Sequence, residues 1–261
     1  MSYALITGAS KGIGKAIAHE LASRMYNVLL VARSENLLKE VSDEIQSKYS
    51  ATCHYLAADL SQPDAPEKIF RWIIENNYPV SVLVNNAGYT IWSKFEKSDI
   101  NEQFNMLQLN LHAKLKLIHH LLPLLHKQSK AFILNVASTS AYQAIPTMST
   151  YAASKAFVIM FTRALRMELK NSNISVSCLS PGTTDTDFMN RAKMDALKAT
   201  AEKFNMKPED VAFIAIKGML AGKAEIIPGF VNWISSKMTS LLPKSVSENV
   251  AAKIYMGKKV S

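Results

Sequence analysis

The chain has 261 residues, of which 48% are apolar, and its formal net charge is +9. This length permits one domain with a large core, and no linker, low-complexity segment or repeat divides it, so we expect one domain over residues 1–261. The apolar runs are strand-sized and far shorter than the roughly 20 residues that span a bilayer. No cluster of Lys and Arg is interleaved with aromatic residues. We therefore expect neither a membrane-spanning helix nor nucleic-acid binding.

The positive charge is concentrated near the end of the chain, where residues 191–261 hold twelve basic and six acidic side chains. This excess suits anionic small molecules, an acidic carrier protein or a membrane surface, of which membrane contact is the least expected. The first apolar run begins at Tyr3 and leaves no room for a cleavable signal peptide, so a cytoplasmic location is the expectation. Cys53 and Cys178 lie in alternating apolar segments, which is typical of buried reduced thiols.

The first motif is a glycine-rich loop between a strand and a helix. The strand pattern Tyr3–Thr7 runs directly into Gly8, Gly12 and Gly14, and the helical pattern Lys15–Arg24 follows. Glycines let a backbone turn tightly and approach a pyrophosphate, while the start of a helix offers free N–H groups. The order strand, loop, helix therefore predicts a dinucleotide phosphate site.

The second strand pattern, Asn27–Ala32, ends in a basic residue. An acid near this point commonly binds the adenosine ribose 2′-hydroxyl, whereas Arg33, followed by Ser34, suits a 2′-phosphate. Lys11 adds a second cation from the glycine loop. Each cation alone also fits an ordinary exposed surface position, but their joint placement favours a phosphorylated dinucleotide.

The middle of the chain continues the alternation of strands and helices. A helix at Leu37–Lys48 precedes a strand at Thr52–Ala57, after which Asp59 and Leu60 follow. Asp59 either caps the next helix or binds an adenine amino group. A strand at Ser81–Val84 then leads into Asn85–Gly88.

Residues 99–125 have apolar positions at a helical period, with Asn110 among them. A helical Asn is often only a local hydrogen-bonding group. His112, His119 and His126 recur every seven residues, a spacing of about 10.5 Å along a helix. That spacing is too long for a shared metal, so we expect no metal site.

A possible proton-transfer set follows the strand pattern Ala131–Val136. Tyr151 and Lys155 are four residues apart in a helical pattern and share one face, and Ser138 lies at the end of the preceding strand. A phenol is a poor acid or base near neutrality unless a cation stabilises its phenolate, which Lys155 would do. The pair alone is also a common surface pattern, and Tyr255 with Lys259 repeats it in a basic tail that lacks a preceding strand and hydroxyl.

The last quarter supplies a sixth strand at Ile174–Leu179 and a loop with Pro181, Gly182, Thr184 and Thr186 that can aim polar groups at a ligand. A helix at Pro208–Leu220, a short strand near 225–227 and two amphipathic stretches complete the chain. We expect the segment near 185–245 to cover the substrate. The alternation predicts an α/β fold of the Rossmann type, a doubly wound parallel sheet of about seven strands flanked by helices on both faces.

Together these motifs resemble the short-chain dehydrogenase/reductase family along nearly all of the chain. The resemblance rests on the T-G-x-x-x-G-x-G loop at Thr7–Gly14, N-N-A-G at Asn85–Gly88, the helical Asn110, the set of Ser138, Tyr151 and Lys155, and the P-G loop at Pro181. The last 60 residues look most like bacterial members that reduce ketones, aldehydes or 3-oxoacyl groups.

The resemblance implies roles for the matching positions. Tyr151 is the expected general acid or base, Lys155 binds the nicotinamide ribose and lowers the pKa of the phenol, Ser138 orients the carbonyl, and Asn110 holds a water that links Lys155 to solvent. The expected coenzyme-binding positions, from the motifs and the resemblance together, are Gly8, Ser10, Lys11, Gly12, Ile13, Gly14, Arg33, Ser34, Asp59, Leu60, Asn86, Ala87, Gly88, Tyr151, Lys155, Pro181, Gly182, Thr184 and Thr186.

The resulting prediction is an NADP(H)-dependent oxidoreductase that acts on a small carbonyl or alcohol, which includes acyl or lipid-like compounds, and that forms a homodimer or homotetramer. Two alternatives remain open at this stage: an NADPH-binding regulator with little turnover, and a reductase dedicated to lipid or acyl-carrier substrates. The apolar segment from Ile226 to Leu242 is expected to act as a lid or a subunit contact.

Overall fold

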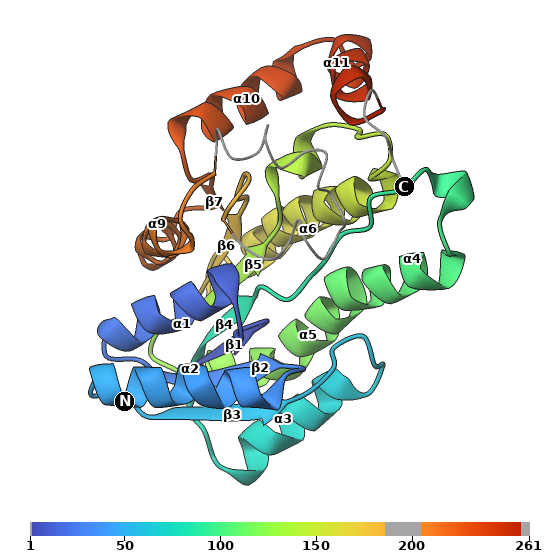
Figure 1. Cartoon of the computed structure of the whole chain (residues 1–261). Coiled ribbons are helices and arrows are strands. Elements are labelled where there is room, and N and C mark those ends of the chain that lie inside the picture. Colours follow the sequence, from blue (N-terminus) through green and yellow to red (C-terminus); the bar gives the residue numbers. More distant parts are fainter. Residues whose placement is uncertain (1, 186–204, 257–261) are drawn as a thin grey trace.

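The computed structural model describes residues 2–185 and 205–256, and its centre is one parallel β-sheet (Figure 1). The strands are β1 (Tyr3–Thr7), β2 (Asn27–Ala32), β3 (Cys53–Ala57), β4 (Val80–Asn85), β5 (Ala131–Val136), β6 (Ile174–Leu179) and β7 (Glu225–Ile226). Their order in the sheet is β3-β2-β1-β4-β5-β6-β7, and every adjacent pair is parallel. The chain therefore winds outward in two directions from β1 and β4, and the predicted doubly wound fold is confirmed.

Helices cover both faces of this sheet. One face carries α1 (Gly12–Ser23), α2 (Glu35–Lys48) and α9 (Pro208–Leu220), and the other carries α3 (Ala65–Glu75), α5 (Ala113–His126) and α6 (Ser149–Glu168). The remaining elements are α4 (Ile100–Leu107), α10 (Phe230–Leu241), α11 (Lys244–Met256) and the short turns η1 (Phe95–Lys97), η2 (Gln108–His112) and η3 (Thr139–Tyr142). Because both faces are covered, the central strands are apolar at nearly every position.

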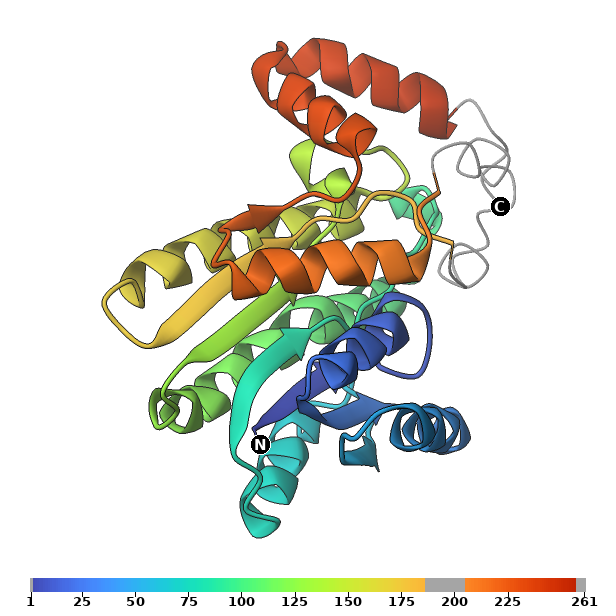
Figure 2. The same cartoon turned by 90° about the vertical axis from the view of Figure 1, so that its left-hand side faces the viewer.

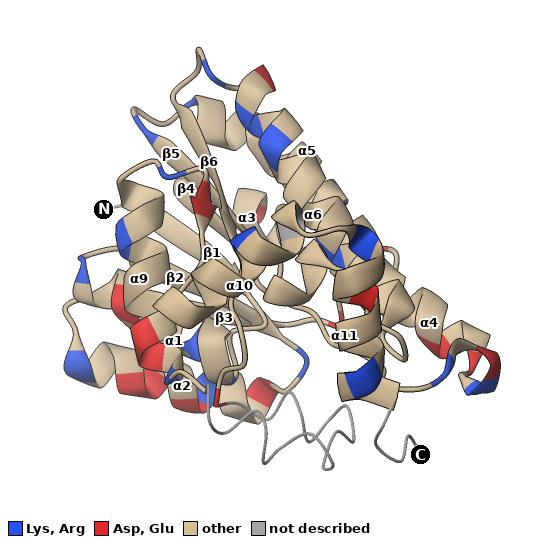
Figure 3. Ribbon diagram, turned by 90° about the horizontal axis from the view of Figure 1, so that it is seen from above, with Lys and Arg blue, Asp and Glu red and all other residues tan. Residues whose placement is uncertain are grey.

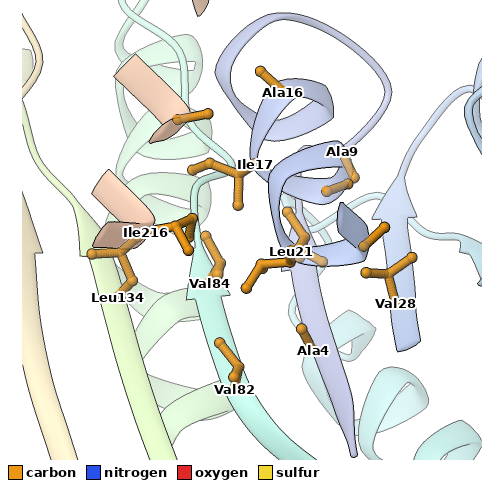
Figure 4. Close-up of a cluster of buried hydrophobic side chains, with 14 of the residues drawn as sticks. Ala4, Ala9, Ala16, Ile17, Leu21, Val28, Val82, Val84, Leu134 and Ile216 are labelled. Atoms are coloured by element: carbon orange, nitrogen blue, oxygen red, sulfur yellow. The ribbon is translucent and has the colours of Figure 1, made fainter. Parts of the chain in front are cut away.

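Alternate residues of each strand enter the two halves of the core. Val82 and Val84 of β4 face the layer of α1 and α9, whereas Leu83 faces the layer of α3 and α5. Figure 4 shows Ile17 of α1 and Ile216 of α9 packed over the same strands. This period of two follows from the pleat of a strand. Because both faces of the sheet are packed, the ends of the strands and the loops that follow them are held in place.

The helix predicted over residues 99–125 is interrupted. It consists of α4, the π-helical turn η2 at Gln108–His112, and α5. A π turn contains one residue more than an α-helical turn, so it changes which face the following residues present, and such turns are frequent at functional sites. Asn110 lies in the middle of η2.

The pair α10 and α11 lies at the end of the molecule beyond β6 and β7, away from α2 and β3, in both Figure 1 and Figure 2. Figure 3 shows that few of its residues are charged. In the described part of the chain, no helix has both the length and the apolar character that crossing a bilayer requires.

Candidate active site

The carboxyl ends of the strands open into one cavity of about 760 Å³. Seventeen of the nineteen predicted coenzyme positions line it, together with Ser138. Gly14 does not line it, and Thr186 lies outside the described residues. The fold thus brings residues from the loops after six strands, β1 to β6, which are far apart in the sequence, to one edge of the sheet.

The glycine-rich loop is held against the loop after β4. Gly8 has φ +67°, a conformation that favours glycine, and a Cβ at Gly14 would collide with the Gly8 carbonyl and the Asn86 side chain. Asn86 Nδ2 donates to the Thr7 and Gly8 carbonyls at 3.0 and 3.2 Å. Thr7 Oγ1 in turn accepts from the backbone N–H groups of Asn86 and Ala87 at 3.0 and 3.1 Å. Gly14 and Asn86 therefore hold the glycine-rich loop in the position in which it lines the cavity.

The end of the cavity near β2 is basic. Arg33 and Lys11 are both exposed and both line the cavity, the first after β2 and the second at the start of α1. Such a pair can bind a phosphate that enters from solvent. The sequence-based grouping of these two cations at one site is supported by this placement.

Asp59 also lines the cavity, but it does not cap a helix. Its Oδ1 accepts from the backbone N–H and the hydroxyl of Ser61 at 3.0 and 2.8 Å, whereas α3 begins only at Ala65. The capping alternative for Asp59 is therefore wrong, because a turn separates it from the helix. The adenine-binding alternative stays a prediction.

Tyr151 is buried in the first turns of α6 and faces the cavity. Burial raises the pKa of its phenol to about 12, and hydrogen bonding with Ser138 opposes this shift. Ser138 is fixed by its own position after β5, where its Oγ accepts from the Ser140 N–H at 3.2 Å. The phenol is thus a neutral proton donor across the physiological pH range.

Lys155 lies one turn after Tyr151 and is 4% exposed. Its Nζ donates to the Val136 carbonyl at 3.1 Å and lies 5.6 Å from the centre of the Tyr151 ring. Burial lowers the pKa of this amine to about 8, so most of it is still cationic at neutral pH. The expected lowering of the phenol pKa by this cation stays a prediction, because burial is the largest effect on Tyr151 in this structure and raises its pKa.

Asn110 is fully buried and does not line the cavity. Its Oδ1 accepts from the Tyr89 N–H at 3.2 Å, and its Nδ2 donates to the Tyr89 carbonyl at 3.0 Å. A Cβ at Gly88 would come within 2.9 Å of Asn110 Oδ1 and 3.4 Å of Lys155 Nζ, so both groups surround this glycine. Asn110 therefore fixes the loop after β4 beside Lys155.

Several cavity residues were not predicted from the sequence. They belong to the segment around Ser138 and Tyr151 and to α11: Ser140, Gln143, Ile145, Met148, Ile254 and Tyr255. Val231, Asn232 and Ser235 also line the cavity and lie in the segment that the sequence predicts to cover the substrate. The sequence places Tyr255 in a basic tail that lacks a preceding strand and hydroxyl, yet this residue lines the same cavity as Tyr151. Its partner in the repeated pattern, Lys259, lies outside the described residues.

Comparisons with known proteins agree with this arrangement. The family model described as short chain dehydrogenase matches residues 2–197. An uncharacterized oxidoreductase of Staphylococcus saprophyticus is 32% identical over 82% of this chain and 88% of that protein. A very-long-chain 3-oxoacyl-CoA reductase of Anas platyrhynchos is 31% identical over 97% of this chain and 79% of that protein.

Among solved structures, an alcohol dehydrogenase from the archaeon Thermococcus sibiricus, complexed with 5-hydroxy-NADP, superposes with a TM-score of 0.76. It is 27% identical, and the match covers 87% of this chain and 95% of that one. The family that the sequence resembles is thereby confirmed: the chain belongs to the short-chain dehydrogenase/reductase family of oxidoreductases.

Proposed function

We propose that the protein is an NADP(H)-dependent oxidoreductase that interconverts a carbonyl compound and the corresponding alcohol. The observation that carries this proposal is the position of Tyr151, Lys155 and Ser138 on the same cavity as the glycine-rich loop. When bound, NADP(H) supplies or accepts the hydride. The remainder of the chemistry, the movement of one proton and the orientation of one oxygen, falls to the side chains of this chain.

The cavity fits NADP(H) in shape and in charge. Gly8 lines the cavity without a side chain, and Gly12 and Ile13, at the start of α1 where N–H groups have no partner within the helix, line it as well. Arg33 and Lys11 suit a 2′-phosphate, and no acidic side chain follows β2 directly. The similar alcohol dehydrogenase of Thermococcus sibiricus binds 5-hydroxy-NADP, a ligand of the NADP type, and this is consistent with the choice.

In the direction of reduction, Tyr151 donates its proton to the substrate oxygen. Ser138 binds the same oxygen and orients it, and Lys155 stabilises the phenolate that remains. In oxidation the phenolate takes the proton back. The water that Asn110 is expected to hold stays a prediction. In this structure the amide of Asn110 forms hydrogen bonds with the backbone of Tyr89.

The alternative of an acyl-type substrate has support of its own. The lining of the cavity includes the apolar side chains Ile145 and Met148, together with Val231 of α10 and Ile254 of α11. One relative is named a very-long-chain 3-oxoacyl-CoA reductase. A regulator without turnover would not need Tyr151 and Lys155 together on the cavity, and this disfavours it.

We also propose that the whole chain forms one oxidoreductase domain.

We further propose that two copies of the chain associate through α4 and α6. These two helices contact each other and expose Phe104, Phe157 and Met160. Exposed apolar patches of this kind commonly mark protein interfaces. Sedimentation as a monomer would contradict the assembly. The cytoplasmic location stays a prediction.

The function is tested by following NADPH oxidation with a panel of ketones, aldehydes, 3-oxoacyl thioesters and steroids. We expect turnover with at least one class, and a slower rate with NADH in its place. An enzyme that binds NADPH but turns over no carbonyl or alcohol in the panel would favour the regulator.

A further inference from the structure

The helix α11 carries a tyrosine into the active site from the far end of the chain. Tyr255 lines the cavity together with Tyr151, although 104 positions separate them in the sequence. The two phenols are close enough that charge on Tyr255 would raise the pKa of Tyr151, an effect smaller than that of burial. Tyr255 therefore lies in the part of the cavity that contains Tyr151.

The burial pattern of α11 shows that Tyr255 lies on the buried side of this helix. Ser247 and Ala251 are buried, and Tyr255 continues this row at the next interval of four residues. Val246 and Val250, which each precede a buried residue of this row, point to another side of the helix and are 45% and 53% exposed. The inward row thus has small residues that let α11 approach closely, and it ends in one large ring.

The ring of Tyr255 packs against an apolar cluster that includes the catalytic tyrosine. The buried members of this cluster are Trp92, Met106, Ile145, Met148, Tyr151 and Ala152. Burial raises the pKa of Tyr255, so its phenol is neutral at physiological pH. The contribution of Tyr255 to this wall is therefore an uncharged, largely apolar surface, the face of its ring.

We propose that Tyr255 is a substrate-positioning residue, whose ring forms the wall beside Tyr151 and selects carbonyl compounds that carry a large apolar group. This inference rests on the proposed function and names the substrate class for it. A carbonyl oxygen held by Tyr151 and Ser138 has its hydrocarbon part beside Tyr255, Ile145 and Met148. Contact with this wall fixes the angle of the carbonyl as well as its affinity.

Two methyl ketones separate this role from a general effect on the fold. Benzylacetone and acetone share the reacting group, and only benzylacetone has a ring to place against Tyr255. Tyr255→Ala removes the wall, Tyr255→Phe keeps it without the hydroxyl, and Val250→Ala changes an exposed residue of the same helix that does not line the cavity.

For Tyr255→Ala we expect kcat/KM with benzylacetone to fall about tenfold or more, the range for lost apolar contact in a binding pocket, while acetone changes little. Tyr255→Phe and Val250→Ala should keep the wild-type ratio between the two ketones. If the ratio of kcat/KM for benzylacetone to that for acetone were the same in wild type and Tyr255→Ala, the proposal would be overturned. A loss of kcat/KM with benzylacetone in Tyr255→Phe as large as in Tyr255→Ala would also overturn it.

Calorimetric binding of benzylacetone gives a readout that needs no turnover. We expect weaker binding only in Tyr255→Ala. If this pattern appears while no variant or wild type oxidises NADPH, the positioning role stands and the proposed reaction fails. Wild-type protein that turns over acetone but does not bind benzylacetone would contradict the substrate class and leave the reaction intact.

Discussion

The Lys155 ammonium nitrogen lies 5.6 Å from the centre of the Tyr151 ring, one helical turn further along α6. Because burial lowers the pKa of Lys155 to about 8, its cationic form is present below this pH and is lost above it. The pKa of Tyr151, about 12, keeps the phenol protonated over the same range. We therefore expect kcat/KM for carbonyl reduction to fall as the pH rises through about 8. In Lys155→Arg this fall should move to higher pH; a wild-type profile that stays flat into the alkaline range would argue against a cationic Lys155.

The coenzyme preference depends on Arg33. Each charge-assisted hydrogen bond to a 2′-phosphate contributes roughly 1.5–3 kcal/mol, so loss of the guanidinium and gain of a negative charge should reduce the preference for NADPH about a hundredfold or more. The measurement is kcat/KM for NADPH and NADH in wild type and Arg33→Asp. Arg71→Asp, an exposed position on α3 away from the cavity, is the matched control and should keep the preference. A wild-type enzyme that uses both coenzymes equally would show this assignment to be wrong.

The stability of the loop after β4 depends on Asn110. Replacement by Ala removes the hydrogen bonds that the Asn110 side chain makes with the half-buried N–H and carbonyl of Tyr89, and each such bond contributes about 0.5–1.5 kcal/mol. We expect a corresponding decrease in the free energy of unfolding, measured by urea denaturation. Asn105→Ala, at an exposed position of α4, should change it by less than about 0.5 kcal/mol.

We expect Lys114 to make the free energy of unfolding depend on pH. It is 4% exposed, its Nζ donates to the Asn85 carbonyl at 2.8 Å, and burial, followed by the charge of Lys155, holds its pKa well below the usual value. Between the folded and unfolded pKa values, the unfolded chain binds more protons, so stability rises with pH in this interval and is lowest at the acidic side of it.

Lys114→Met removes this dependence, which has a slope of at most about 1.4 kcal/mol per pH unit for one proton. The unfolding free energy of the variant minus that of wild type should therefore decrease as the pH rises toward about pH 10, whatever its sign at neutral pH. Lys116→Met changes an exposed lysine two positions away and should give a difference that is independent of pH. If the unfolding free energies of Lys114→Met and wild type changed in parallel with pH, the lowered pKa of Lys114 in the folded protein would be contradicted.

The residues that the sequence predicted correctly for the cavity share one physical property. Arg33 and Asn86 directly follow the end of a strand, Ser138 comes two residues after β5, and parallel strands bring their carboxyl ends to one edge of the sheet. An apolar run is easily recognised as a strand, and the residue after it is then placed without knowledge of the packing.

Tyr255 and Lys114 could not be placed in this way. The position of Tyr255 depends on how α11 packs against distant parts of the chain, and a Tyr and a Lys four residues apart do not specify a partner. Lys114 follows the π turn that contains Asn110, and the additional residue of this turn changes the face that later residues present. A regular helical period therefore does not tell which of Lys114 and Lys116 points inward.

The most direct test of the account is Tyr151→Phe, which removes the transferable proton and keeps the ring. General acid or base groups contribute about 10²- to 10⁴-fold to turnover, so we expect a loss of this size in kcat, with NADPH binding in a fluorescence titration unchanged. Tyr89→Phe removes a hydroxyl that does not line the cavity and should keep the wild-type rate. A Tyr151→Phe enzyme that retains turnover within a few-fold of wild type, with NADPH still bound, would contradict the assignment of Tyr151 as the proton donor.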